Sequence, residues 1–221
     1  MIPGRLETVA VIGNGIIGHG IAQIFAAAGR QVVMIGRNQD SLDRAMNKIA
    51  ASLDDFAAHG LIDSASRQAS LARIKTSLRL EDAAAAVTED LPLKLDLFGR
   101  LDRICPPPAV LGSSSGQPAS ALIANVANPE RVIATHFWYP PQLIPLVEVC
   151  AGPKTAPDVT RWVCEVLKQA GKEPAVIDKE IPGFIGNRLQ FAMLREAWAL
   201  WASGAASAEA IDSVVRNSFG R

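Results

Sequence analysis

The chain opens with a short apolar stretch, a glycine-rich turn and a helical apolar pattern in direct succession. Thr8–Ile12 is rich in β-branched residues and predicts a buried strand. The segment GNGIIG follows at residues 13–18, and apolar positions then repeat at helical spacing as far as Gly29. A second apolar run, Val32–Ile35, predicts another buried strand. Together these segments predict a βαβ unit with parallel strands.

Helix and strand patterns continue to alternate up to about residue 181. A long amphipathic helix is expected from Ser41 to Gly60, and residues 63–79 are interpreted as a further helix. Further helices are expected at 93–101 and from a Thr155 cap to Gly171, and strands at 110–111, 132–134 and 175–177. This order predicts an α/β fold of Rossmann type, with a doubly wound and mostly parallel sheet.

The pattern changes at Pro182, after which helices are no longer separated by strands. Ile185–Ser203 predicts one long, largely apolar helix, and Ser207 can cap another that runs to about Val215. We therefore expect a dinucleotide-binding domain at residues 1–181 and an incomplete, all-helical C-terminal domain at residues 182–221.

Length, charge and cysteine content narrow the class of protein. The 221 residues correspond to about one and a half domains. Lys plus Arg and Asp plus Glu each number 22, which gives no argument for a nucleic-acid partner. No apolar run reaches the roughly 18 residues of a membrane span, and the N-terminus has no signal-peptide layout. Three widely spaced cysteines indicate reduced thiols and a cytoplasmic protein without a metal site.

The GNGIIG turn has the chemistry of a dinucleotide site. Its first glycine permits a tight turn, its second lets the backbone approach a pyrophosphate, and its third lets helix and strand pack closely. The N-terminus of the following helix offers N–H groups and a positive dipole end. The alternative is an ordinary glycine-rich βα turn. The predicted cofactor-binding residues here are Gly13, Asn14, Gly15, Ile16, Ile17 and Gly18.

The end of the second predicted strand leaves the choice of cofactor open. An NAD site usually carries an acidic residue there, which binds the ribose hydroxyls. Here Gly36 stands at that position and Arg37 follows it. An arginine can bind a 2′-phosphate, so NADP is possible beside NAD. The alternative is that Arg37 is solvated and that Asn38 or water serves the ribose.

Three stretches carry a resemblance to a known family. They are VAVIGNGIIGHGIAQIFAAAG, THFWYPPQLIPLVEV and KEIPGFIGNRLQFAMLREAWAL, at residues 9–29, 135–149 and 179–200. The chain resembles the L-3-hydroxyacyl-CoA dehydrogenases over nearly its whole length. The last stretch is closer to the branch of L-gulonate 3-dehydrogenase and lambda-crystallin. The resemblance implies an oxidoreductase that forms a homodimer. It also implies a role in fatty acid metabolism.

The resemblance also implies roles for individual residues. It makes His136 the catalytic histidine, Glu148 the carboxylate that orients it and Ser115 the active-site serine. It places Asn187 at the substrate carbonyl. It further implies cofactor contacts at Glu89 and Lys94.

The chemistry of the reaction accounts for these residue types. Oxidation of a secondary alcohol needs a base for the hydroxyl proton, and an imidazole backed by a carboxylate supplies one. Serine and asparagine side chains can orient the developing carbonyl oxygen. The predicted activity is hydride transfer between a nicotinamide cofactor and a small-molecule 3-hydroxy acid or 3-hydroxyacyl-CoA. A catalytically silent dinucleotide-binding homologue, or a fragment, is the alternative.

Three features depart from the family pattern. The strand expected before TEDLPLK is shorter by about seven residues, which leaves Ala84–Val87 as a stub. Tyr139 replaces the asparagine that the family usually has there, near the nicotinamide. The family continues beyond Arg221 with helices that complete the substrate cleft and the dimer interface. We expect a second copy of the chain to cover the apolar face of the 185–203 helix.

Overall fold

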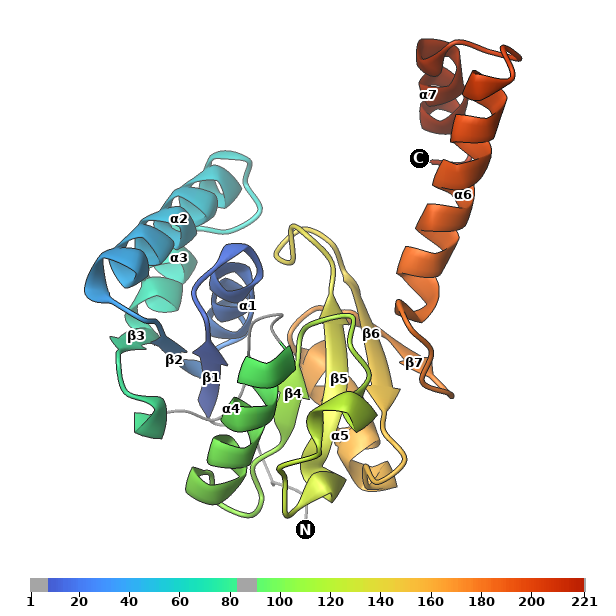
Figure 1. The fold of residues 1–221 in the computed structure, drawn as a ribbon. Coiled ribbons are helices and arrows are strands. Elements are labelled where there is room, and N and C mark those ends of the chain that lie inside the picture. The colour runs from blue at the N-terminus through green and yellow to red at the C-terminus, as the bar shows by residue number, and fades with distance from the viewer. Residues whose placement is uncertain (1–7, 83–90, 221) are drawn as a thin grey trace. The chain divides into compact units, whose positions relative to one another are not determined.

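The computed structural model describes residues 8–82 and 91–220, which form two compact units divided between Pro182 and Gly183 (Figure 1). The strands of the first unit are β1 Thr8–Ile12, β2 Gln31–Ile35, β3 Ile74–Ser77, β4 Leu111–Ser113, β5 Val132–Phe137, β6 Leu146–Ala151 and β7 Glu173–Ile177. Its α-helices are α1 Ile16–Ala27, α2 Gln39–Ala58, α3 Ser64–Ala72, α4 Leu91–Ile104 and α5 Pro157–Gln169.

The described strands form two blocks of sheet. One block has the order β1-β2-β3 and is parallel throughout. The other has the order β4-β5-β6-β7, and only its β5–β6 pair is antiparallel. The expected mostly parallel α/β fold is thereby confirmed, although β6 is not among the predicted strands. The expected strand stub at residues 84–87 lies outside the described residues.

A single hydrophobic core joins the two blocks. Val11 and Met34 from the first block belong to the same buried cluster as Ile133 and Val149 from the second. Helices α1, α2 and α5 contribute to this cluster, whereas α4 lies on the opposite side of the sheet from α5 (Figure 1). Helices on both faces are what a doubly wound fold requires, because each face of a parallel sheet has to be buried.

Helix α2 shows how the apolar spacing specifies packing. Its buried residues follow the i, i+3, i+4 pattern predicted for an amphipathic helix and are Leu42, Ala45, Ile49 and Leu53. The helix begins earlier than predicted, because the side chain of Asn38 accepts a hydrogen bond from the backbone N–H of Ser41 at 2.9 Å.

The single helix predicted over residues 63–79 is wrong in its second half. Helix α3 ends at Ala72, and β3 then pairs with β2 in parallel. Of the residues in β3, Ile74 is buried whereas Lys75 and Thr76 are exposed. One buried position gives no periodic signal, so this edge strand depends on its backbone pairing with β2.

The predicted cap at Thr155 is also wrong. Helix α5 begins after Ala156 without a side-chain cap. The Thr155 hydroxyl instead accepts from the backbone N–H of Gly152 at 2.8 Å and donates to the carbonyl of Val132 at 2.6 Å. Its side chain therefore joins the start of β5 to the turn that follows β6.

The second unit contains α6 Phe184–Ala202 and α7 Ala208–Asn217. Ser207 caps α7 as predicted, since its hydroxyl accepts from the backbone N–H of Ala210. Helix α6 is apolar, yet much of it is exposed, including Leu189, Phe191, Trp198 and Trp201. Among the helices of the described ranges, none combines the length and apolar character that crossing a membrane would require.

Candidate active site

The sheet brings Ser115 and His136 to the same edge. Strands β4 and β5 are parallel, and Ser113 lies opposite Ala134 in their register. Ser115 and His136 each follow these partners by two residues. Both side chains therefore come at the carboxyl ends of neighbouring parallel strands, where α/β sheets bind their ligands.

His136 and Glu148 form a pair across two antiparallel strands. They are direct partners in the β5–β6 register, so the 12-residue interval between them is a hairpin spacing. The Nδ1 atom of His136 lies 2.8 Å from Oε2 of Glu148. The side chain of Glu148 is 2% exposed and that of His136 is 13% exposed. A buried carboxylate at Nδ1 places the ring proton there and makes Nε2 the basic nitrogen.

A second donor, which is not among the predicted site residues, bonds the same carboxylate. The indole N–H of Trp138 lies 3.3 Å from Oε2 of Glu148. The Trp138 and His136 rings are neighbours, with centroids 5.7 Å apart. Their i, i+2 spacing at the end of a strand, which puts both side chains on one face, is the signal that could have revealed this contact.

Ser115 lies in a buried polar cluster with Lys94 and Ser113. The ammonium of Lys94 donates to Oγ of Ser115 at 2.5 Å, and Oγ of Ser113 lies 3.1 Å from that same atom. Each of the three side chains is at least 97% buried. A cation directed at the serine oxygen can polarise its O–H toward a developing carbonyl oxygen. Lys94, which the resemblance gives as a cofactor contact, is thus found bonded to the serine.

The geometry of the glycine turn fits a dinucleotide. Gly13 has φ of +96°, a conformation that favours glycine, and a Cβ on Gly18 would lie 1.8 Å from the Gly13 carbonyl oxygen. A Cβ on Gly15 would meet no atom within 4 Å, so the approach to the backbone is open. Helix α1 has no side-chain cap and no acidic residue in its first turn. The turn therefore presents N–H groups to an incoming anion, as pyrophosphate binding requires.

Packing explains why the second strand ends without an acidic residue. A Cβ on Gly36 would lie 2.7 Å from Cγ of Leu42 and 3.2 Å from Oδ1 of Asn14. Leu42 is fully buried and cannot move away cheaply. The neighbouring Arg37 is exposed, and the carboxamide oxygen of Asn38 is engaged in capping α2.

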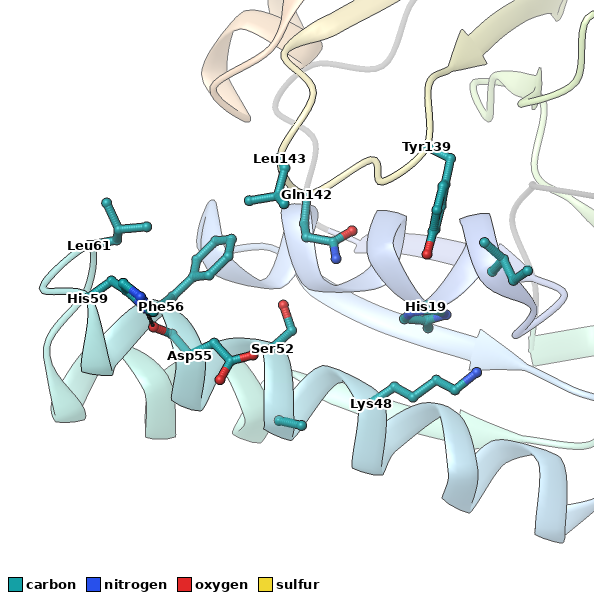
Figure 2. A pocket seen from close by; sticks show the side chains of 12 residues that line it. His19, Lys48, Ser52, Asp55, Phe56, His59, Leu61, Tyr139, Gln142 and Leu143 are labelled. Carbon is teal, nitrogen blue, oxygen red and sulfur yellow. Dashed lines mark hydrogen bonds between the residues drawn. The ribbon is translucent and has the colours of Figure 1, made fainter. Parts of the chain in front are cut away.

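A groove of about 670 Å³ lies beside this turn (Figure 2). Its walls come from α1, from α2 and from the loop after β5. Figure 2 shows Tyr139 reaching from that loop toward His19 on α1, with Lys48 on α2 below them. The groove is lined by Ile16, His19, Lys48, Ala51, Ser52, Asp55, Phe56, His59, Leu61, Tyr139, Gln142 and Leu143. Tyr139 stands at the position that the resemblance puts near the nicotinamide, whereas Lys48 and Phe56 are not among the predicted site residues, because no local motif marks them.

Two of the predicted site residues are not tested by this geometry. Asn187 lies in the first turn of α6 in the second unit, so its place at the substrate remains a prediction. Glu89 lies outside the described residues.

The cysteines offer no alternative nucleophile. Burial, with Glu180 and Glu148 nearby, raises the pKa of Cys150 to about 11. Burial likewise raises the pKa of Cys105 and of Cys164. All three therefore stay protonated near neutral pH. No cluster of potential metal ligands occurs within residues 8–82 and 91–220.

Comparison with known protein families places this geometry in context. Residues 8–181 match the family described as 3-hydroxyacyl-CoA dehydrogenase, NAD binding domain. Residues 183–221 match its C-terminal domain. The chain belongs to the 3-hydroxyacyl-CoA dehydrogenase family. The resemblance drawn from the three sequence stretches is confirmed.

Individual members of the family are similar over nearly the whole chain. L-carnitine dehydrogenase of Streptomyces griseus is 37% identical over 99% of this chain and 66% of its own length. The 3-hydroxyadipyl-CoA dehydrogenase of Escherichia coli is 34% identical over 98% of this chain and 47% of its own length. The structure of (S)-3-hydroxybutyryl-CoA dehydrogenase from Ralstonia eutropha matches with a TM-score of 0.90 and 29% identity, over 98% of this chain and 79% of that one. The chain thus spans about two thirds of the first relative and about half of the second.

Proposed function

We propose that this chain carries the active site of a nicotinamide-dependent dehydrogenase, which interconverts a 3-hydroxy group and a 3-oxo group. The observation that carries the proposal is the His136–Glu148 pair, with a 2.8 Å contact and a carboxylate that is 98% buried. This pair comes at the same sheet edge as Ser115. An imidazole held in this way is a general base suited to a secondary alcohol.

In the proposed reaction, each of these residues has its own role. His136 takes the hydroxyl proton at Nε2, and Glu148 stabilises the imidazolium that results. Ser115, polarised by Lys94, orients the oxygen that becomes the carbonyl. Asn187 of the second unit assists at that oxygen. The nicotinamide, when bound at the glycine turn, supplies the hydride chemistry.

The substrate class is a small 3-hydroxy acid or its CoA thioester. Similar proteins are named for L-carnitine, 3-hydroxyadipyl-CoA and 3-hydroxybutyryl-CoA, all of which carry a 3-hydroxy group. The groove beside α1 and α2 is the proposed place for the part of the substrate away from the reacting carbon.

The cofactor is NAD, and we propose that NADP is accepted as well. The match to an NAD binding domain supports the first statement. Two observations support the second, namely the absence of a carboxylate at Gly36 and the exposed guanidinium of Arg37 beside it.

The proposed partner is a second copy of the chain, and the proposed location is the cytoplasm. A second copy of the chain is proposed to cover the exposed apolar residues of α6, among them Trp198 and Trp201. None of the three cysteines, all within the described ranges, forms a disulfide, which supports the cytoplasm as the proposed location.

Turnover measurements test the proposed function. Purified chain is mixed with NAD or NADP and with 3-hydroxybutyryl-CoA, L-carnitine or L-gulonate, and nicotinamide reduction is followed. We expect reduction with at least one of the three. Cofactor binding without any reduction, in protein shown to be folded, would favour a silent dinucleotide-binding homologue instead.

A further inference from the structure

The loop between β5 and β6, residues 138–145, forms one wall of the groove in Figure 2. It directly follows the strand that carries His136. It contributes Tyr139, Gln142 and Leu143 to the lining. Tyr139 and Leu143 are 66% and 59% exposed, so these two side chains do little to bury the loop. Something other than their packing has to fix the position of this wall.

Lys172 holds the loop from its inner side. Its ammonium donates to the carbonyl of Pro141 at 2.6 Å and to that of Ile144 at 3.0 Å. The residue is only 6% exposed. The next residue supports the same segment, since the backbone N–H of Glu173 donates to the carbonyl of Pro145 at 2.9 Å.

This lysine is unusual in its partners. Within residues 8–82 and 91–220, the groups found bonded to its ammonium are backbone carbonyls, and no carboxylate is among them. Burial lowers the pKa of Lys172, which is the direction expected when an ammonium loses water. A buried cation is costly, and it persists where its hydrogen bonds compensate for lost hydration. Here those hydrogen bonds go to the loop alone.

Gly20 also lies against the loop. It lies on α1, and a Cβ built on it would lie 2.5 Å from Cγ of Pro141 and 2.8 Å from Oε1 of Gln142. A proline ring cannot rotate out of the way as a flexible side chain can. The close approach of α1 and the loop therefore depends on the absence of a side chain at Gly20.

We propose that Lys172 and Gly20 are positioning residues for substrate binding, which together fix the 138–145 loop as the wall of the groove. Lys172 draws the loop inward through two carbonyls, and Gly20 leaves the space into which it is drawn. The effect on substrate rests on the proposed function, whereas the effect on the loop does not. His136 and Glu148 are themselves partners in the β5–β6 ladder, and of the loop residues Trp138, which begins the loop, also contacts Glu148. Loss of either positioning residue is therefore expected to weaken substrate binding more than it slows the chemical step.

Amide hydrogen exchange tests the hold on the loop without any need for activity. The amides of Leu143 and Ile144 both donate to the carbonyl of Pro140, so they report on the loop directly. In Lys172→Met we expect their exchange to accelerate about tenfold to hundredfold, as for the loss of a charge-assisted hydrogen bond. Lys168→Met is the matched control. It removes an exposed lysine that precedes Lys172 closely in the chain, and it should leave both exchange rates unchanged.

Steady-state kinetics test the consequence for substrate. Lys172→Met is expected to lower kcat/KM by up to roughly a hundredfold, the cost of a misplacement of about 1 Å, with most of the change in KM. The dissociation constant for NADH should stay the same. Methylamine added to Lys172→Ala should lower the raised KM part of the way back toward the wild-type value. A general loss of stability would not be rescued in this way.

Gly20→Ala is the second variant, in case the lysine variants do not fold. It leaves Lys172 intact but pushes Pro141 outward, so it should give the same exchange and KM changes. Unchanged exchange at Leu143 and Ile144 in folded variants would overturn the proposal. Faster exchange with an unchanged KM would overturn its substrate part. If the wild-type chain shows no turnover, the proposed function fails, and the exchange experiment still decides whether these residues hold the loop.

Discussion

At the scale of single residues, the structure brings side chains that are distant in sequence into hydrogen-bonded pairs at the candidate active site. His136 and Glu148 are 12 residues apart in the chain and 2.8 Å apart at their contacting atoms. Ser115 and Lys94 are joined in the same way at 2.5 Å. The family resemblance implies the residues of both pairs. The bond from Lys94 to the serine and the support from Trp138 are visible only once the strands are placed.

Replacing Glu148 tests whether the carboxylate orients the imidazole. In Glu148→Gln the ring loses the anion that stabilises its protonated form, and the amide can favour the wrong tautomer. We expect kcat to fall by roughly 10³-fold to 10⁴-fold with little change in NADH affinity. Steady-state rates with the best substrate provide the measurement. Glu165→Gln, an exposed change on α5, is the control, and an equal loss in both variants would contradict the role of Glu148.

Replacing Arg37 tests the choice of cofactor. If the guanidinium binds a 2′-phosphate, Arg37→Ala removes a charge-assisted hydrogen bond that NAD does not use. We expect the dissociation constant for NADPH to rise about tenfold to hundredfold and that for NADH to change less than about twofold. Fluorescence titrations with the two cofactors measure both constants. Equal effects on both would remove the argument for NADP.

At the scale of elements, apolar patterning predicts the long helices and the buried strands but misses β3 and β6. Helix α2 is correctly predicted because four buried residues repeat along it. Strand β3 is missed because Ile74 is its only buried residue. The Thr155 hydroxyl is interpreted as a helix cap, whereas it bonds a strand carbonyl that is distant in sequence. Such long-range hydrogen bonds have no local signature, so sequence reasoning cannot find them.

A buried ion pair joins α4 to the start of β5. Nη2 of Arg131 lies 2.9 Å from Oδ1 of Asp102, and these side chains are 6% and 3% exposed. Burial alone would raise the pKa of Asp102, but hydrogen bonds from Arg131, Asn128 and the Ala127 backbone outweigh it and hold the pKa below its ordinary value. The pair therefore stabilises the fold above the ordinary pKa of an aspartic acid. That contribution is lost as pH falls through the lowered pKa.

Arg131→Met is expected to be strongly destabilising. It leaves the Asp102 carboxylate buried without its cation, which should cost about 3–5 kcal/mol of unfolding free energy at neutral pH. Urea unfolding at several pH values provides the measurement. The difference from wild type should narrow in acid, where Asp102 becomes protonated. Arg161→Met removes an exposed arginine of α5 and is the control. A constant difference at all pH values would contradict this account of the pair.

At the scale of the whole molecule, the sequence predicts the order of the α/β fold and the helical segment, but not how the strands divide into two blocks of sheet. The α/β fold and the helical segment after it are both found. The two sheet blocks share one core, although no strand within the described ranges pairs one block with the other. A second copy of the chain is the proposed cover of the exposed apolar residues of α6.

Self-association of the chain is expected from those exposed residues. Analytical ultracentrifugation of purified protein should give the mass of a dimer. Trp198→Lys with Trp201→Lys should shift that mass toward a monomer, because a lysine resists burial in an apolar interface. Arg161→Met again serves as a surface control. A monomer mass that does not change with concentration would contradict the proposed partner.

The central claim is that His136 is the general base of a nicotinamide-dependent dehydrogenase. The most direct measurement is the rate of nicotinamide reduction by wild type and by His136→Gln, with NADH binding measured on the same preparations. The account predicts turnover by wild type, a loss of about 10²-fold to 10⁴-fold in the variant, and equal NADH affinity in both. A His136→Gln variant that turns over as fast as wild type would contradict the claim.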